Sequence, residues 1–132
     1  MTPSPFPLDF AALIPDTRPR RWLILPPGFV SAAQPDAVSP VFACTPAALL
    51  SAVDAVALAE ERTVRMRDGG GQAEYVQRSK IFKFPDRITV EAMATGDGAA
   101  LAAYSRAEVG RYDFKVNQRR LERWIAALQD RL

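Results

Sequence analysis

The chain of 132 residues contains no histidine and one cysteine, Cys44. Histidine is the commonest general base and the commonest metal ligand, so its absence argues against a zinc site and against the usual acid–base chemistry. A single cysteine cannot form an intrachain disulfide, which fits a reducing compartment. We therefore expect no metal, no cofactor and a cytoplasmic location.

Long apolar runs are also missing from the sequence. The longest uncharged stretch near the N-terminus, residues 37–53, contains two prolines and many small residues, so we expect no membrane-spanning segment and no membrane partner. The first ten residues lack both a basic start and an apolar run, so we expect no signal peptide.

Charge is unevenly distributed along the chain. The net charge is +2, with −3 over residues 1–61 and +5 over residues 62–132. The basic half could favour an anionic partner, although a normally solvated surface explains the same excess. We do not expect nucleic acid as a partner.

Ten of the eleven prolines lie in the first 46 residues. Proline favours extended backbone and turns, but this region is too apolar for a free tail. We expect one domain of residues 1–132, in which residues 1–44 form a proline-rich extended arm that packs on a body of residues 45–132. Within the arm the sequence predicts a short helix at Leu8–Ile14 and short strands at Trp22–Leu25 and Val38–Ala43.

The body has two predicted helices with strands between them. Thr45 and Pro46 suit the start of a helix that runs to about Glu61. A last amphipathic helix is expected to begin between Asp113 and Asn117 and to continue to the C-terminus. The four strands predicted between the helices are Thr63–Asp68, Ala73–Phe84, Arg87–Ala94 and Ala99–Ser105, and Pro85-Asp86 is expected to end the second.

Short turns between these strands require antiparallel pairing. The predicted fold class is therefore α+β, with a four- to five-stranded antiparallel sheet and two helices on one face. The element order is (β)-α-β-β-β-β-α, preceded by the proline-rich arm. The first strand in this order is Val38–Ala43, if it pairs with the sheet.

The last helix carries polar residues where its apolar stripe should be. On a helical wheel Asn117 falls inside the stripe and Arg120 lies at its edge. Unsatisfied buried polar groups cost on the order of 1–3 kcal/mol, so both need partners. Candidate partners are Asp86, Ser105, Arg106 and Asp113. The cluster either ties strand and helix together or forms a cleft where Arg106 and Arg120 receive a carboxylate or phosphate.

These positions resemble the C-terminal signature of the DUF1499 family, bacterial and plant proteins of unknown function. The residues that carry the resemblance are Ser105-Arg106, Gly110, Asp113, Asn117 and Arg120, with Tyr75-Val76-Gln77-Arg78-Ser79 and Phe82-x-Phe84-Pro85-Asp86 upstream. Lys115 departs from the pattern, because the resemblance leads us to expect glycine there. The resemblance implies no catalytic residue.

The function we expect is a non-catalytic small-ligand or protein-binding domain with its site at the last strand–helix junction. One alternative is an enzyme that uses Asp86, Asp113 and the two arginines. Another is weak binding of nucleic acid on a basic sheet face. That face would combine Arg65, Arg67, Arg78, Lys80, Lys83 and Arg87 with Tyr75, Phe82 and Phe84.

Overall fold

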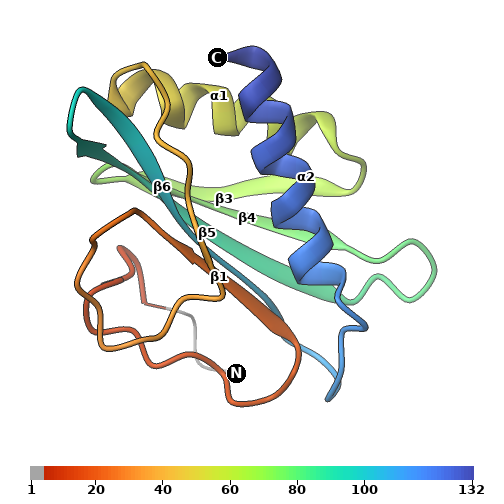
Figure 1. Cartoon of the computed structure of the whole chain (residues 1–132). Coiled ribbons are helices and arrows are strands. Elements are labelled where there is room, and N and C mark those ends of the chain that lie inside the picture. Colours follow the sequence, from red (N-terminus) through yellow and green to blue (C-terminus); the bar gives the residue numbers. More distant parts are fainter. Residues whose placement is uncertain (1–4) are drawn as a thin grey trace.

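The computed structural model describes residues 5–132, so residues 1–4 of the predicted arm lie outside the described part. The protein is α+β, with two helices on one face of a twisted sheet and the N-terminal arm on the other (Figure 1). In chain order the elements are β1 (Arg21–Leu25), β2 (Ala37–Val38), α1 (Pro46–Ala59), β3 (Thr63–Gly69), β4 (Gln72–Arg78), β5 (Pro85–Thr95), β6 (Gly98–Ala107) and α2 (Val116–Arg131).

The sheet has six strands in the order β2-β1-β6-β5-β4-β3. It is mixed, because β2 runs parallel to β1 while the other pairs are antiparallel. The predicted α+β class is correct, but the prediction of four to five antiparallel strands is too low in number and lacks the parallel β1–β2 pair. The short strand predicted at Trp22–Leu25 is confirmed as β1, and it belongs to the sheet. Its last three residues are buried in succession, as expected for a strand with both faces covered.

The predicted strand Val38–Ala43 is wrong in extent. It is reduced to the short strand β2 and to an isolated bridge between Phe42 and Ala99. Pro40 lies between these two contacts, and a proline has no backbone N–H to donate to a neighbouring strand.

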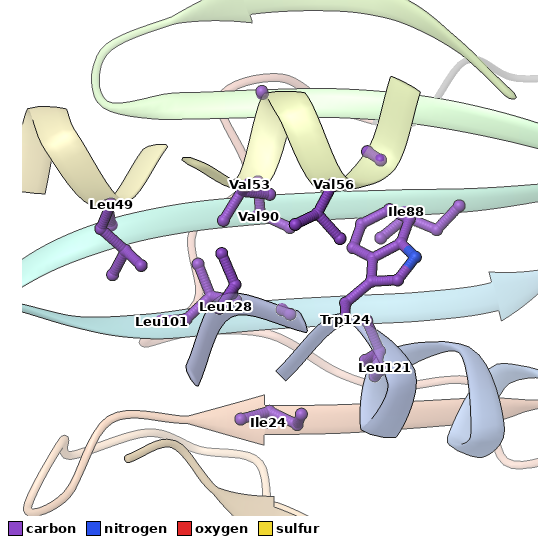
Figure 2. Close-up of a cluster of buried hydrophobic side chains, with 14 of the residues drawn as sticks. Ile24, Leu49, Val53, Val56, Ile88, Val90, Leu101, Leu121, Trp124 and Leu128 are labelled. Atoms are coloured by element: carbon purple, nitrogen blue, oxygen red, sulfur yellow. The ribbon is translucent and has the colours of Figure 1, made fainter. Parts of the chain in front are cut away.

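Both predicted helices are confirmed. Thr45 caps α1 with its side chain, which accepts a hydrogen bond from the backbone of Ala48, and Pro46 occupies the first turn. α2 begins at Val116, inside the expected window. The apolar stripes of both helices pack on the same sheet face (Figure 2). Tyr75 and Trp124 belong to this core, and their rings meet edge to face with centroids 5.8 Å apart.

The opposite sheet face is covered by the arm. Leu8, Phe10 and Leu13 pack there against Leu23 and Tyr104. The short helix predicted at Leu8–Ile14 is wrong, because this segment forms only a turn at residues 10–12. The Asp9 side chain accepts the backbone N–H groups of the next turn residues and satisfies them without a helix.

The predicted strand Ala73–Phe84 is too long. β4 ends at Arg78, and Pro85 begins β5 by pairing with Arg78, so Pro85-Asp86 starts a strand where we expected it to end one. Ser79 and Phe84 close the intervening loop, because each backbone N–H donates to the other residue, one to a carbonyl and one to a hydroxyl oxygen. Residues 79–84 therefore form a projecting loop.

Candidate functional site

Asn117 and Arg120 point from α2 toward the sheet and meet Ser105 of β6. The Ser105 hydroxyl donates to Asn117 Oδ1 at 2.6 Å, and one terminal nitrogen of Arg120 donates to the same oxygen at 2.7 Å and to Ser105 Oγ at 3.0 Å. Asn117 is 0% exposed and Arg120 is 3% exposed. These three side chains form a closed, buried network between helix and strand.

Arg120 also reaches two further strands. Its Nε donates to Gln77 Oε1 of β4 at 2.9 Å, and its Nη2 forms an ion pair with Asp86 Oδ2 of β5 at 2.8 Å. Each of its three guanidinium nitrogens therefore already donates a hydrogen bond inside the protein. An added anion would have to compete with Asp86, so Arg120 is poorly placed as an anion receptor.

Asp113 organises the turn that leads into α2. Its carboxylate accepts the backbone N–H groups of Lys115 at 2.9 Å and Asn117 at 3.1 Å, and the Asn117 side-chain amide at 2.8 Å. It thus caps the amides that the helix start leaves free. Phe114 and Lys115 have φ values of 54° and 67°, and Lys115 is the position where the resemblance led us to expect glycine.

Asp86 lies between the buried network and solvent. Burial raises the pKa of its carboxyl above the ordinary value of 3.8, and the adjacent charge and hydrogen bond of Arg120 counteract that rise only in part. The negative charges of Asp113 and Glu108 raise the pKa further.

Arg106 lies apart from the cluster, on the arm side of the sheet. Consecutive residues of a strand point to opposite faces, so Ser105 and Arg106 cannot share one. Its guanidinium donates to Thr89 Oγ1 at 2.9 Å and to the Tyr104 carbonyl at 3.0 Å, and it lies 4.6 Å from the Tyr104 ring centroid. Burial lowers its pKa to about 10. Arg106 and Arg120 therefore do not share a cleft.

Gln77 is a member of the network that the sequence analysis missed as a site residue. Besides accepting from Arg120, its amide nitrogen donates to Glu60 after α1 and to Thr63 of β3, each at 2.8 Å. Strand alternation could have found it, because Gln77 follows the buried Tyr75 by two residues and so faces the helices.

A pocket of about 480 Å³ opens beside the cluster, between the β4–β5 loop, the β6–α2 connection and the start of α2. We call it the junction pocket. Asp86, Asp113 and Arg120 line it, whereas Ser105 and Asn117 lie behind them. Its other lining residues include four apolar side chains near the mouth and two cationic ones: Phe84, Val109, Tyr112, Phe114, Arg62 and Arg78.

The basic residues proposed for a nucleic-acid-binding sheet face are divided. Arg65 pairs with Asp54 on the helix side, while Arg67 and Arg87 pair with the buried Glu74 on the arm side. Tyr75 is buried in the core. The exposed remainder, Arg78, Lys80, Phe82, Lys83 and Phe84, belongs to the end of β4 and the loop after it. These residues therefore do not form one basic face.

The described residues contain neither a cluster of metal ligands nor a membrane-spanning helix. Over residues 5–132 no three histidine, cysteine, aspartate or glutamate side chains gather closely enough to hold a metal ion. In the same part of the chain, neither helix has the length and apolar character needed to cross a bilayer.

Comparison with known proteins gives the family and no more. No curated protein matches the chain. The sequence model of the family described as "Protein of unknown function (DUF1499)" matches residues 23–128, from β1 to near the end of α2. The match includes every residue of the polar cluster and of the junction pocket. On this match, the chain belongs to the DUF1499 family.

Proposed function

We propose that this protein is a non-catalytic binding or accessory domain and that the junction pocket is its binding site. The ligand class we propose is a small molecule or partner side chain that combines an apolar body with a negative charge. The observation that carries the proposal is the pocket itself. Its volume of about 480 Å³ falls in the range of small-molecule sites, and polar groups lie at its base.

The walls of the pocket support an apolar ligand body. Phe84 from one side and Tyr112 and Phe114 from the other are exposed to solvent at its mouth. A ligand that covered these rings would remove apolar surface from water at about 25 cal/mol per Å². Such rings contribute to an apolar site more than to the fold, because they pack on neither hydrophobic core.

The charges of the pocket support an anionic group at its rim. Arg120 is neutralised by Asp86, and Asp113 is used as a helix cap. The Arg78 side chain is exposed and donates one hydrogen bond, from Nη1 to the Lys83 carbonyl, and no ion pair found within residues 5–132 includes it. We therefore assign the anion to Arg78 and not to Arg106 and Arg120, which one of the two interpretations of the cluster had combined in a cleft.

The second candidate is an enzyme that uses the same pocket. It is favoured by the raised pKa of Asp86, because perturbed carboxyls in pockets often act as acids or bases. Against it, the remaining members of the cluster are tied to one another or to backbone groups. We retain the cytoplasm as the proposed location, on the basis of the single cysteine.

The proposal is tested by a thermal-shift panel of small aromatic and aliphatic anions, with naphthalene-2-sulfonate, benzoate and decanoate as probes. A ligand that binds only the folded state raises the melting temperature. At a ligand concentration of about 100 times Kd, it raises the free energy of unfolding by about 2.7 kcal/mol. We expect the shift to shrink in Phe84→Ser and Arg78→Ser. Val30→Ser, which changes an exposed apolar residue of the arm, is the matched control and should keep it.

Either of two outcomes would contradict the proposal. One is that no probe shifts the melting temperature of the wild-type protein. The other is that Phe84→Ser and Arg78→Ser respond as strongly as Val30→Ser, because the probe would then bind elsewhere.

A further inference from the structure

Two segments at one end of the sheet project large apolar side chains into solvent. The β4–β5 loop carries Ile81 and Phe82, which are 78% and 72% exposed, and the β6–α2 connection carries Phe114, which is 83% exposed. Figure 1 shows both segments at the same end of the molecule, and they line the junction pocket from two sides. Single exposed apolar residues are ordinary, but a group on two neighbouring loops marks an interaction surface.

The same two segments carry most of the positive charge that lacks a counter-ion. Residues 78–84 and 109–116 together hold five cationic side chains and one acidic one, a net charge of +4, so the rest of the chain carries −2. The five cations are Arg78, Lys80, Lys83, Arg111 and Lys115, all exposed. None of the ion pairs found within residues 5–132 includes them.

We infer that this end of the protein docks on the surface of a membrane that contains anionic lipids. Aromatic and aliphatic side chains interleaved with lysine and arginine are the combination that enters the headgroup region while the cations meet lipid phosphates. The expectation of no membrane partner came from the lack of a spanning segment, and a surface contact needs none. This inference needs no pocket ligand, although Arg78 and Phe114 belong both to the junction pocket and to the docking surface.

The shape of the surface favours a bilayer over a protein or nucleic acid. The apolar residues stand on two separate tips on either side of a pocket, so a rigid partner would have to match both tips at once, whereas a fluid surface adapts to them. Phe82 and Phe84 stack on each other with ring centroids 5.4 Å apart, which leaves less ring face for stacking on bases.

Vesicle flotation with the full-length protein tests the inference. The vesicles are phosphatidylcholine alone, or phosphatidylcholine with about 30% phosphatidylglycerol, at about 50 mM and about 500 mM salt. We expect flotation only with the anionic vesicles at low salt. Lys80→Ser with Lys83→Ser should weaken binding about fivefold per removed charge. Phe82→Ser with Phe114→Ser should weaken it at least about tenfold.

Matched controls separate docking from folding. Val30→Ser and Arg131→Ser change exposed residues of the same types elsewhere and should float like the wild type. All variants should melt at the wild-type temperature, because the changed side chains lie outside both cores. Failure of the wild type to float, or equal flotation of the tip variants, would overturn the inference. Binding to polyglutamate or oligothymidine without flotation would assign the surface to another partner and would also overturn it.

Discussion

Arg120 joins three strands to the last helix through a single side chain. Its guanidinium contacts Gln77 of β4, Asp86 of β5 and Ser105 of β6, while its backbone belongs to α2. Buried ion pairs with hydrogen bonds on every donor are costly to break, because the partner is left as an uncompensated buried charge. At the scale of residues, we therefore propose that the inner part of the cluster stabilises the fold.

Arg120→Ala should lower the free energy of unfolding by roughly 3–5 kcal/mol, because it leaves Asp86, Gln77 and Asn117 without their shared donor. Arg119→Ala, an exposed arginine on the same helix, should change it by less than about 0.5 kcal/mol. Urea denaturation measures both. A loss below about 1 kcal/mol for Arg120→Ala would show that the network does not stabilise the fold.

The pKa values of Asp86 and Glu60 should shift in opposite directions from their ordinary values. Burial raises the pKa of Asp86 above 3.8; burial also acts to raise the pKa of Glu60, but hydrogen bonds from Arg123 and Gln77 bring it below 4.5. Glu60 therefore adds stability above pH 4.5 that is lost as the pH falls through its folded pKa. Protonation of Asp86 has the opposite sign and favours the folded state as the pH falls toward 3.8.

Carboxyl ¹³C NMR titration measures both pKa values directly. Asp36→Asn is a suitable control variant for assignment, because Asp36 lies on the opposite edge of the sheet and its loss should leave both titrations unchanged. A pKa at or below 3.8 for Asp86 would contradict the burial argument.

Part of the cluster could be predicted from residue positions and part could not. The helical wheel placed Asn117 on the inward face, because the period of 3.6 residues puts it in line with Leu121, Trp124 and Leu128. Arg106 was placed in the cluster by nearness in sequence, although strand alternation sends it to the other face of the sheet. Asp86 was among the candidate partners, but one sequence could not single out its pair with Arg120, because that pair depends on the register across β5 and β6.

The turn between β6 and α2 contains two residues with left-handed backbone just before the helix begins. Phe114 and Lys115 are both in the left-handed region, which costs roughly 1–2 kcal/mol for a residue with a β-carbon. The backbone and side chain of Asp113 hold this turn through hydrogen bonds to Lys115, Val116 and Asn117. The family resemblance led us to expect glycine at position 115. The positive φ of Lys115 gives the physical reason, because glycine adopts this conformation without strain.

Lys115→Gly should raise the free energy of unfolding by roughly 0.5–1 kcal/mol, because relief of the left-handed strain exceeds the added freedom of the unfolded chain. Arg119→Gly, in the helix interior, should instead lower it by about 1 kcal/mol. Paired denaturation curves compare the two. Destabilisation by Lys115→Gly would mean that the turn is not strained there.

Element boundaries were predictable where local chemistry sets them. The cap at Thr45 and Pro46 fixed the start of α1, and the apolar period located α2. The end of β4 was not predictable, because Pro85 reads equally as the end of one strand and the start of the next. The mutual hydrogen bonds of Ser79 and Phe84 decide between them, and these depend on the folded loop.

In the whole molecule, the arm contributes strands β1 and β2 to the sheet and also covers one of its faces. β1 lies between β2 and β6, and Leu8, Phe10 and Leu13 bury the face opposite the helices. Gln72 and Glu74 are buried beneath that cover, where Gln72 bonds the Leu8 backbone and Glu74 binds two arginines. We therefore propose that residues 1–132 fold as one cooperative unit.

A chain that begins at Thr45 should not fold cooperatively, since it lacks β1 and exposes the polar groups beneath the arm. Differential scanning calorimetry should show one transition for the full chain and none for the truncated one. Addition of a peptide spanning residues 5–44 should restore a transition. A truncated chain that melts like the full chain would show that the arm is dispensable.

The junction pocket is the proposed binding site of this protein. Amide NMR shift mapping tests directly whether a ligand binds there. The ¹⁵N-labelled full-length protein is titrated with naphthalene-2-sulfonate, an aromatic anion that matches the proposed ligand class. We predict saturable shifts confined to Arg62, Gln77, Arg120 and the segments 78–86 and 107–116, which together contain the lining residues of the pocket. These shifts should be lost in Phe84→Ser. Shifts centred on the arm or around α1, or no shifts at all, would contradict the claim.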